Sequence, residues 1–356
     1  MKFFLLPALA LGIVSTARAC DLCGCYIPQI EAPPEATADV VFGQFVGVEG
    51  AGKRSWIDGL YGALSEQFTH FGTTQLEGNE VSNPTGQYLD SAITQLVLGY
   101  TFNSRFALQL NLPFIYRSFE RPEGFAIDRG TESGLGDISL LGKFVAYHTE
   151  LGGRTSLQFN RDAKEPKMIT QEPDFTASVV LLAGIKFPTG DTSRIKEEFN
   201  ETEVLGAPES GIHGHDLTLG TGSYDGIFGG QTSLRYRNWF FQGDLQFTLR
   251  GDGRHQYNFA NDISWEVGPG YYLVRRREAV VGLQLLIAGE HKGKDQFRGL
   301  PAEDTGVTAL FLGPEVVAGF GRVSAEVAVE FPVLIDNTAF QVVPDYRVRG
   351  GIAIRF

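Results

Sequence analysis

The sequence is poor in sulfur and has few long apolar runs. It contains 3 cysteines, all between positions 20 and 25, and 2 methionines among 356 residues. A body without cysteine excludes a fold that is held together by disulfides. Beyond the first 19 residues no stretch approaches eighteen consecutive apolar positions, and this excludes a bundle of transmembrane helices.

Basic residues are also scarce. Lys and Arg total 30 against 42 Asp and Glu, for a net charge of −12. Removing Lys2 and Arg18 with a leader peptide leaves 28 basic against 42 acidic residues, or −14. Such a surface repels phosphate backbones, so no nucleic-acid partner is expected. Glycine and phenylalanine are abundant instead, with 44 and 27 residues. Glycine is well above the usual share of about 7%, which favours strands and turns.

The first 19 residues have the pattern of a secretory signal peptide. Lys2 precedes an apolar run from position 3 to 14, and Ala17 and Ala19 form an A-x-A cleavage site. This order of charge, apolar core and small residues predicts export and cleavage after Ala19.

From about residue 59 onward the chain alternates between apolar and polar positions, which predicts β-strands with two unlike faces. Around position 245 the two faces are Trp239, Phe241, Leu245, Phe247 and Leu249 against Phe240, Gln242, Asp244, Gln246, Thr248 and Arg250. Segments of this kind are about ten to sixteen residues long. A tilted strand that crosses a membrane needs about nine to eleven.

About twelve strands are expected. They lie near 59–72, 88–102, 105–119, 134–148, 175–189, 217–236, 238–250, 261–274, 278–291, 306–320, 322–335 and 345–356. Their connections alternate between tight turns, such as Asn103-Ser104 and Gly321-Arg322, and long polar loops, such as 190–216. The long segment 149–174 breaks this rule, and we interpret it as a periplasmic excursion or as extra strands.

These features predict an all-β fold: a transmembrane, antiparallel, up-and-down β-barrel of about 12 strands in the outer membrane of a Gram-negative bacterium. A closed sheet leaves no unpaired edge in the lipid. A secreted β-sandwich or propeller also alternates, but its strands are shorter and no repeat of about 40 residues is present. The final strand alternates and ends in Phe356, like the signal read by the outer-membrane assembly machinery. Membrane lipid and this machinery are therefore the expected partners.

Placing the apolar face outward leaves a charged lumen. The predicted lumen-lining residues are Lys143, Lys186, Arg235, Arg237, Asp244, Arg250, Glu266, Glu290, Glu326, Glu330, Arg347, Arg349 and Arg355. Isolated charges out of water are costly, so these groups either pair across the lumen or line water. Two interpretations remain open: a paired ladder that closes and stiffens the barrel, and a conducting path that orients a solute.

Three motifs follow one another along the chain: GLGD at 134–137, KFPTGD at 186–191 and GTGSYD at 220–225. Together they resemble the outer-membrane proteins grouped as meta-pathway phenol-degradation transporters, over roughly residues 90–356. The resemblance implies a transporter-like barrel that handles small apolar or aromatic compounds and carries no catalytic residue. The long 149–174 segment and the N-terminal cysteines depart from that family. Taken by themselves, the motifs have the residue types of turns and close strand approaches.

Two sequence patterns bear on enzyme chemistry, a histidine pair and the lipase motifs. His213, His215 and Asp216 lie in the loop 190–216, where an exposed histidine pair is expected and weak metal binding is the alternative. A surface protease needs a facing carboxylate pair, and no strand end shows adjacent Asp residues. The lipase patterns H-x-S-N and G-x-S-x-G are absent. The sequence therefore predicts a protein that is not an enzyme.

Cys20, Cys23 and Cys25 form a C-x2-C-x-C motif at the start of the mature chain. Without a following His the motif does not fit covalent haem attachment. Three interpretations remain: a disulfide with one spare thiol, a soft-metal site for Cu or Zn, and a lipid anchor on Cys20.

The expected organisation is a signal peptide at 1–19, a periplasmic cysteine-containing segment at 20–58 and a barrel at 59–356. The favoured function is passage or binding of a small solute. The alternative is a silent barrel that anchors a metal-binding or redox segment. Channel conductance would distinguish the two.

Overall fold

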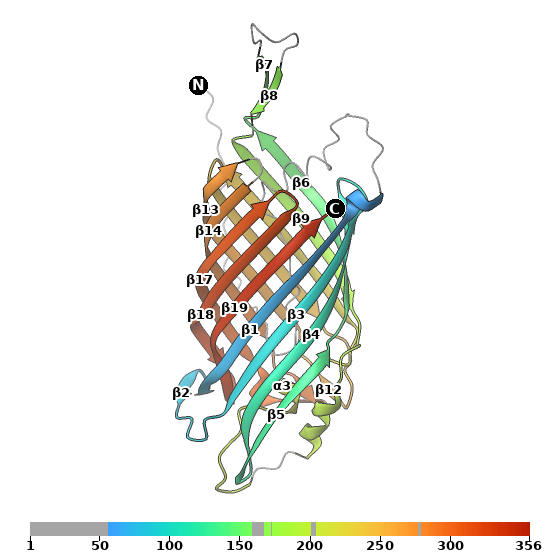
Figure 1. Cartoon of the computed structure of the whole chain (residues 1–356). Coiled ribbons are helices and arrows are strands. Elements are labelled where there is room, and N and C mark those ends of the chain that lie inside the picture. Colours follow the sequence, from blue (N-terminus) through green and yellow to red (C-terminus); the bar gives the residue numbers. More distant parts are fainter. Residues whose placement is uncertain (1–55, 159–166, 172, 201–203, 277–278) are drawn as a thin grey trace, which may run out of the picture.

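The computed structural model contains a closed antiparallel β-barrel of 12 strands (Figure 1). It describes residues 56–158, 167–171, 173–200, 204–276 and 279–356. The expected signal peptide and the cysteine motif lie outside these residues. No helix among the described residues is long and apolar enough to cross a membrane.

Neighbouring strands of the wall follow one another along the chain, as in an up-and-down barrel. The wall strands are β1 (Leu60–Leu76), β3 (Tyr88–Thr101), β4 (Phe106–Glu123), β6 (Ser139–Leu151), β9 (Phe175–Lys186), β10 (Asp225–Tyr236), β11 (Trp239–Leu249), β13 (Asp262–Arg276), β14 (Ala279–Lys292), β17 (Val307–Phe320), β18 (Val323–Asn337) and β19 (Phe340–Arg355). The barrel closes where β1 pairs with β19, from Tyr61 opposite Arg355 to Leu76 opposite Phe340. The backbone N–H of Phe356 extends this seam by donating to the carbonyl of Leu60 at 3.1 Å.

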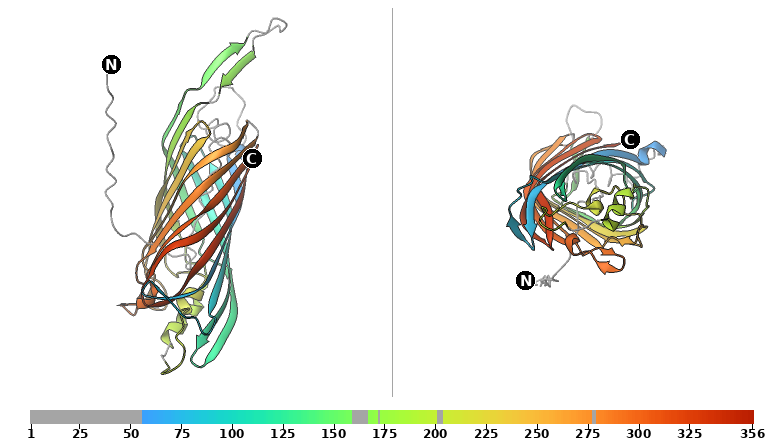
Figure 2. Two further views of the ribbon diagram at one scale, coloured as in Figure 1. Left: turned by 90° about the vertical axis from the view of Figure 1, so that its left-hand side faces the viewer. Right: turned by 90° about the horizontal axis from the view of Figure 1, so that it is seen from below.

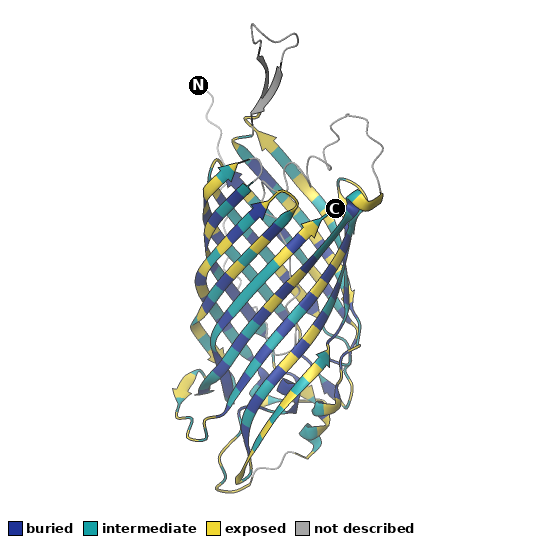
Figure 3. Cartoon of the chain, in the orientation of Figure 1, coloured by how far each residue is buried: buried dark blue, intermediate teal, exposed yellow. Residues whose placement is uncertain are grey.

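The predicted alternation is confirmed as an apolar outer face and a mixed inner face. On β11, Leu245, Phe247 and Leu249 are exposed, whereas Gln246 and Thr248 are buried. Figure 3 shows the same alternation of exposed and buried positions along the wall. A closed sheet with apolar side chains outside satisfies its backbone groups within the wall, as an outer-membrane barrel must.

The two ends of the barrel differ, as the sequence predicts. One end has short turns, and the long loops gather at the other. Outer-membrane barrels place short turns in the periplasm and long loops outside. The outward-facing rings of Trp239 and Tyr271 meet near the short-turn end, with centroids 5.0 Å apart, and such aromatic residues are typical of a membrane interface.

The segment 149–174 leaves the wall at the short-turn end. After β6 the chain forms a separate hairpin of β7 (Arg154–Gln158) and β8 (Lys167–Gln171), and it then returns to the wall in β9. Figure 1 shows this hairpin standing beyond the barrel. The excursion adds two strands outside the wall and leaves the number of wall strands at twelve.

Two predicted strands begin later than expected. The strand predicted over 217–236 begins at Asp225, and the strand predicted over 134–148 begins at Ser139. Residues Ala126–Leu135 form a separate strand, β5, that pairs with residues 114–123 of β4, the half of that strand nearest the long loops. Alternation alone does not distinguish a wall strand from a segment whose side chains are buried by packing inside the barrel.

The long-loop end carries the remaining short elements. These are β2 (Asn79–Val81), η4 (Ser193–Phe199), α3 (Gly214–Leu217), β12 (Tyr257–Asn258), β15 (Gln296–Phe297), β16 (Leu300–Pro301) and η5 (Glu303–Thr305). The helical turn η3 (Trp56–Gly59) precedes β1. Seen along the barrel, the segment that contains η4 and α3 lies within the ring of strands (Figure 2).

Candidate functional site

The connection between β9 and β10 folds across the mouth of the barrel. We call its described residues, 187–200 and 204–224, the plug (Figure 2). The sequence places these residues in a loop and a strand. The structure instead buries much of the second half, including Ile212 and Leu217.

Apolar side chains of the plug pack against the inner wall. Leu219 contacts Ile93 and Ile115, which face inward from β3 and β4. A second cluster joins plug residues to wall residues of β1, β3, β4 and β19; its members are Phe71, Leu89, Phe119, Ile212, Leu217 and Val342. This burial removes apolar surface from water and so holds the plug against one side of the lumen.

Two arginines of β4 hold the plug, one through backbone carbonyls and one through a carboxylate. Arg117 is fully buried, and its guanidinium donates to the carbonyls of Asp216 and Thr218, the second at 2.5 Å. Arg121 donates to the carboxylate of Glu197 at 2.7 Å. Hydrogen bonds from a charged donor are the strong ones in proteins. These hydrogen bonds therefore attach both halves of the plug to the wall.

The three sequence motifs meet at one point. The carboxylate of Asp137 accepts the backbone N–H of Gly190 at 2.9 Å and that of Thr221 at 2.8 Å. The hydroxyl of Thr189 donates to the carbonyl of Gly136 at 2.7 Å. Asp137 thus ties both ends of the plug to the loop that precedes β6.

The plug is a closed loop whose ends touch. The carbonyl of Asp191 accepts the backbone N–H of Leu219 at 3.0 Å and that of Gly220 at 3.1 Å. A Cβ at Gly190 would lie 2.5 Å from the carbonyl oxygen of Leu219. The glycine of the KFPTGD motif is therefore needed for this close approach of two backbones.

A chain of buried ion pairs runs along the strand ends next to the plug, from β9 to β13. Lys186 Nζ lies 3.0 Å from Asp225 Oδ2, which is also 2.9 Å from Arg250 Nη1. Arg250 continues to Asp262, with Nε 2.7 Å from Oδ2. Lys186 also lies 3.6 Å from Asp137, so the chain connects to the carboxylate that anchors the plug.

A second network crosses the lumen. Arg347 of β19 pairs with Glu290 of β14 at 2.9 Å and with Glu330 of β18 at 3.4 Å. Arg349 of β19 pairs with Glu330 and with Glu266 of β13, each at 2.5 Å. Three strands separate β13 from β19 in the wall, so these side chains bridge the interior. Of the two lumen interpretations, this arrangement fits the paired ladder.

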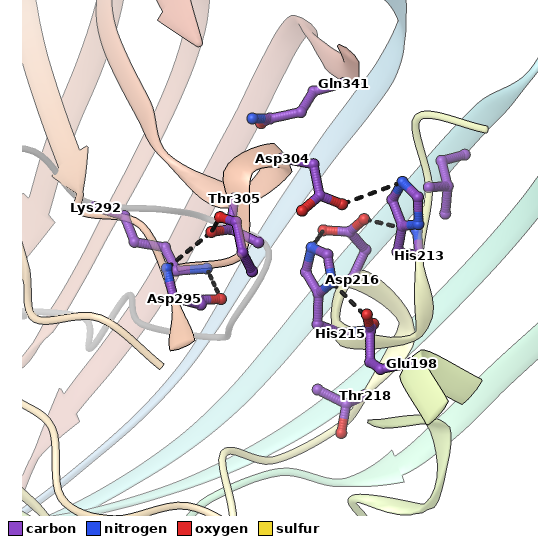
Figure 4. A network of polar contacts seen from close by, with 12 residues as sticks. Glu198, His213, His215, Asp216, Thr218, Lys292, Asp295, Asp304, Thr305 and Gln341 are labelled. Atoms are coloured by element: carbon purple, nitrogen blue, oxygen red, sulfur yellow. Dashed lines mark hydrogen bonds and ion pairs between the residues drawn. The ribbon is translucent and has the colours of Figure 1, made fainter. Parts of the chain in front are cut away.

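Two stacked histidines form the centre of the plug (Figure 4). The ring of His215 lies between Glu198 and Asp216, with Nδ1 2.9 Å from Glu198 Oε1 and Nε2 3.3 Å from Asp216 Oδ1. The parallel ring of His213, 5.6 Å away, reaches Asp304 of η5 with Nε2 3.2 Å from Oδ2. The pair therefore links η4 and α3 of the plug to η5, which belongs to the loop between β14 and β17.

The charge of His215 depends on these neighbours. Its burial acts to lower the pKa, but the carboxylates of Asp216 and Glu198 outweigh it and raise the pKa of His215 well above its usual value. Burial acts to raise the pKa of Glu198, and His215 more than offsets this and lowers that pKa to about 2. Both groups are therefore charged near neutral pH and form a buried ion pair.

A neighbouring carboxylate fixes the loop between β14 and β17. Asp295 accepts from Tyr257 Oη and from Lys292 Nζ, each at 2.6 Å (Figure 4 shows the lysine). Burial and then the charge of Asp295 raise the pKa of Tyr257 well above its usual value. Tyr257 belongs to β12, between β11 and β13, and its ring stacks on His215 at 5.6 Å, so its hydrogen bond to Asp295 connects both loops to the histidine pair.

The structure corrects the expectation for the histidines. The sequence predicts an exposed pair, whereas His215 is 3% exposed. Among the described residues, no group of three or more His, Cys, Asp or Glu side chains is arranged to hold a metal ion. The histidines are instead paired with carboxylates. The cysteines proposed as soft-metal ligands lie outside the described residues.

Most predicted lumen residues take inward positions on the strands. Lys186 and Arg250 belong to the buried ion chain, and Glu330, Arg347 and Arg349 to the crossing network. The residues at other inward positions are Lys143 opposite Ala107, Arg235, Asp244 opposite Gln231, Glu326 opposite Val317, and Arg355 opposite Tyr61.

Arg237 is the exception, since it lies in the tight turn between β10 and β11. Its φ is +55°, and its side chain is 65% exposed beside Asp174. Alternation would place Arg237 on the same face as Arg235 only if β10 continued, and the turn ends β10 at Tyr236.

Comparison with protein-family models gives no match, and comparison with curated protein sequences gives none. Among solved structures, the chain is similar to an outer-membrane channel from Pseudomonas putida F1, with a TM-score of 0.50 and 13% identity over 87% of this chain and 99% of that one. The β domain of the Bordetella autotransporter BrkA has a TM-score of 0.43, with 10% identity over 83% and 99%. The toluene transporter TodX of P. putida has a TM-score of 0.32, with 10% identity over 84% and 90%. Together with the apolar outer face, the likeness to the Pseudomonas channel identifies the fold as an outer-membrane β-barrel.

Proposed function

We propose that the chain is an outer-membrane channel for small solutes and that the plug is its gate. The observation that carries this proposal is the way in which the plug is attached. It is held in the mouth mainly by side-chain hydrogen bonds, ion pairs and packing, with the backbone N–H of Val342 also donating to the carbonyl of Gly211, rather than as a wall strand. Such contacts can be broken locally while the wall sheet stays intact.

The wall surface that the plug covers favours an apolar or aromatic compound as the solute. The wall that contacts the plug presents Phe71, Leu89, Ile93, Ile115 and Phe119 toward the lumen. Displacing the plug would expose these side chains beside the charged network. A binding path of mostly apolar surface with a few placed polar groups suits small apolar compounds that carry one polar function. The family resemblance in the sequence favours the same class.

The test is single-channel conductance in planar bilayers. The ends of the plug touch at Asp191 and Leu219, so a short Gly-Ser linker can replace residues 193–217 without stretching the wall. We expect low conductance from the intact chain and a several-fold increase from this deletion. Adding phenol or benzoate should reduce the current through the open form more than adding a sugar of similar size.

The matched control shortens the other end of the molecule. A Gly-Ser linker in place of residues 155–170 removes most of the hairpin of β7 and β8, whose ends pair at Arg154 and Gln171. This variant should conduct like the intact chain. If the plug deletion stays folded and remains as silent as the intact chain, the lumen is closed by its own side chains. The second function, a barrel that anchors the cysteine segment, would then be favoured.

A further inference from the structure

Two carboxylates on neighbouring strands face the lumen beside the crossing network. Glu315 lies on β17 and Glu326 on β18, and the residues before and after each of them are exposed on the outer face, including Val316 and Val327. Since successive side chains on a strand point to opposite faces, both carboxylates point inward. Ala328 separates Glu315 from Arg349 across the wall.

A buried amide lies next to the first carboxylate. Gln284 of β14 is directly opposite Glu315. Its side chain is 6% exposed, and it faces inward because Leu283 and Leu285 are exposed on the outer face. Its Oε1 has no hydrogen-bond partner. Directly opposite residues have Cβ atoms about 5 Å apart, so this unpartnered oxygen belongs to the same part of the lumen as the carboxylate of Glu315.

The described part of the chain provides no donor for these acceptors. Within it, Glu315 and Glu326 take part in no hydrogen bond or close ion pair. Arg349 is near enough for its charge to act on both, but its guanidinium is already paired with Glu266 and Glu330. Buried polar groups in proteins nearly always have partners. Three acceptors without a donor therefore indicate a ligand that donates hydrogen bonds.

The same part of the lumen has an excess of acidic groups. Two guanidinium groups face five carboxylates, and these residues are Arg347 and Arg349 with Glu266, Glu290, Glu315, Glu326 and Glu330. Like charges held together disfavour one another's ionised form. A cation that enters this region offsets that repulsion and is attracted into it.

The donors and the charge fit an ammonium group. No three carboxylates of the described residues converge closely enough to hold a metal ion. An alkylammonium group is larger than a bare metal ion, and it combines one positive charge with three N–H donors. It therefore matches the two carboxylates of Glu315 and Glu326 and the amide oxygen of Gln284.

An apolar surface adjoins these acceptors on the short-turn side. Val317 lies directly opposite Glu326 and packs in one cluster with Phe240 and Tyr272. The rings of Phe240 and Tyr272 are stacked, with centroids 4.4 Å apart. Apolar surface beside a few placed polar groups orients a ligand that has one polar end.

We propose that Glu315, Glu326 and Gln284 form a site in the lumen that binds the ammonium group of a small organic amine. This inference rests on the proposed function and narrows it, because it assigns a cation as the polar group of the apolar solute. The ammonium group donates to the two carboxylates and the amide oxygen, and the apolar part of the solute lies toward Val317.

Titration calorimetry of the full chain in lipid nanodiscs tests the site, with empty nanodiscs as the blank. The probe is 2-phenylethylammonium, and its matched controls are the neutral 2-phenylethanol and the anionic phenylacetate. We expect saturable binding of the amine, at least tenfold weaker binding of the alcohol and none of the acid. Binding does not require conductance. A silent chain that binds the amine would contradict the channel and support the site, whereas a conducting chain that does not bind it would overturn the site.

Two variants identify the acceptors. Glu315→Gln with Glu326→Gln keeps the side-chain size and removes both charges, so affinity for the amine should fall at least tenfold. Gln284→Leu removes the third acceptor and should lower affinity several-fold; it should remain folded, since it removes an unpaired buried oxygen. The matched control is Glu66→Gln, which removes a carboxylate exposed on the outer face of β1 and should leave affinity unchanged.

Heat-modifiable migration in gels checks that each variant is folded. Equal affinity for the amine and the alcohol, or unchanged affinity in the double glutamine variant, would overturn the proposal.

Discussion

Glu266 and Arg349 form an ion pair across the lumen at 2.5 Å, although they belong to strands that are four places apart in the wall. Arg349 also pairs with Glu330, so its guanidinium lies between two carboxylates. The barrel interior is therefore occupied by charged side chains that hold one another away from the wall. Under the proposed function, this network and the plug are two separate barriers along the path of the solute.

Removing the central cation should weaken the first barrier. Arg349→Gln leaves Glu266 and Glu330 without this partner, so the free energy of unfolding should fall by about 3 kcal/mol. In the plug-deleted form its conductance should also rise, because the bridging side chain is gone. Urea unfolding in lipid vesicles and single-channel recording measure the two effects. Arg129→Gln removes an exposed arginine from its pair with Glu120 and should change neither quantity. Unchanged unfolding in Arg349→Gln would contradict the role of the network.

Arg117 should decide whether the plug stays in the mouth. Arg117→Met keeps much of the side-chain length but leaves the carbonyls of Asp216 and Thr218 without their charged donor. The plug should be destabilised by about 2–3 kcal/mol. Limited proteolysis of the folded protein should then cleave within 187–224 at lower protease concentration than in the unaltered chain. Arg129→Met is a suitable control on the same sheet. Equal cleavage in the unaltered chain and Arg117→Met would show that packing alone holds the plug.

Plug stability should depend on pH through His215. A histidine whose folded pKa is raised contributes stability that is full below its unfolded pKa of about 6.5 and is lost as pH rises through the folded value. Glu198, with its pKa lowered to about 2, contributes above about 4.3 and loses its contribution as pH falls toward 2. Protection of the plug from protease should therefore be greatest between about pH 4.3 and 6.5 and should decline in alkali.

His215→Gln isolates this effect, since glutamine does not titrate. The variant should lose about 3 kcal/mol of plug stability at pH 6, because two buried carboxylates lose their cation. Its alkaline decline should also disappear. A profile that keeps the alkaline decline after this substitution would assign the decline to another group.

The lipid face is tested by a matched pair on β11. Leu245→Arg puts a cation into the lipid and should cost about 2–4 kcal/mol near mid-membrane. Gln246→Arg puts the same cation into a lumen that already contains carboxylates and should cost less. Folding into vesicles of the two variants gives the difference directly. Equal costs would contradict the assignment of the two faces.

Periodicity was enough to predict the barrel and its faces because lipid imposes one rule on every wall strand. The alternation of Leu245, Gln246 and Phe247 follows from that rule alone. The plug is different, because Leu217 and Leu219 also alternate with polar residues, yet they face the lumen wall rather than lipid. Alternation does not mark them, and Gly190, which the structure needs where the ends of the plug meet, has the residue type of an ordinary turn in the sequence.

The candidate site was predicted only in part for the same reason. The lumen charges follow from strand phase, so Arg347 and Arg349 could be placed on the inner face. Their partners could not be assigned, because Glu266 and Glu290 reach them from strands that are far apart in the sequence. His215 was expected in solvent, since a loop position gives no information on which carboxylates fold over it.

The seam between β1 and β19 also sets the order in which the molecule can assemble. Tyr61 pairs with Arg355, 294 positions later, whereas the other wall contacts join strands that are near neighbours in the chain. Bringing such distant segments together costs more loop-closure entropy and is slow. Hairpins can therefore form early, while the ring stays open until this pairing is made. The plug connects β9 to β10, near the middle of the wall, so it can fold against β4 before the ring closes around it.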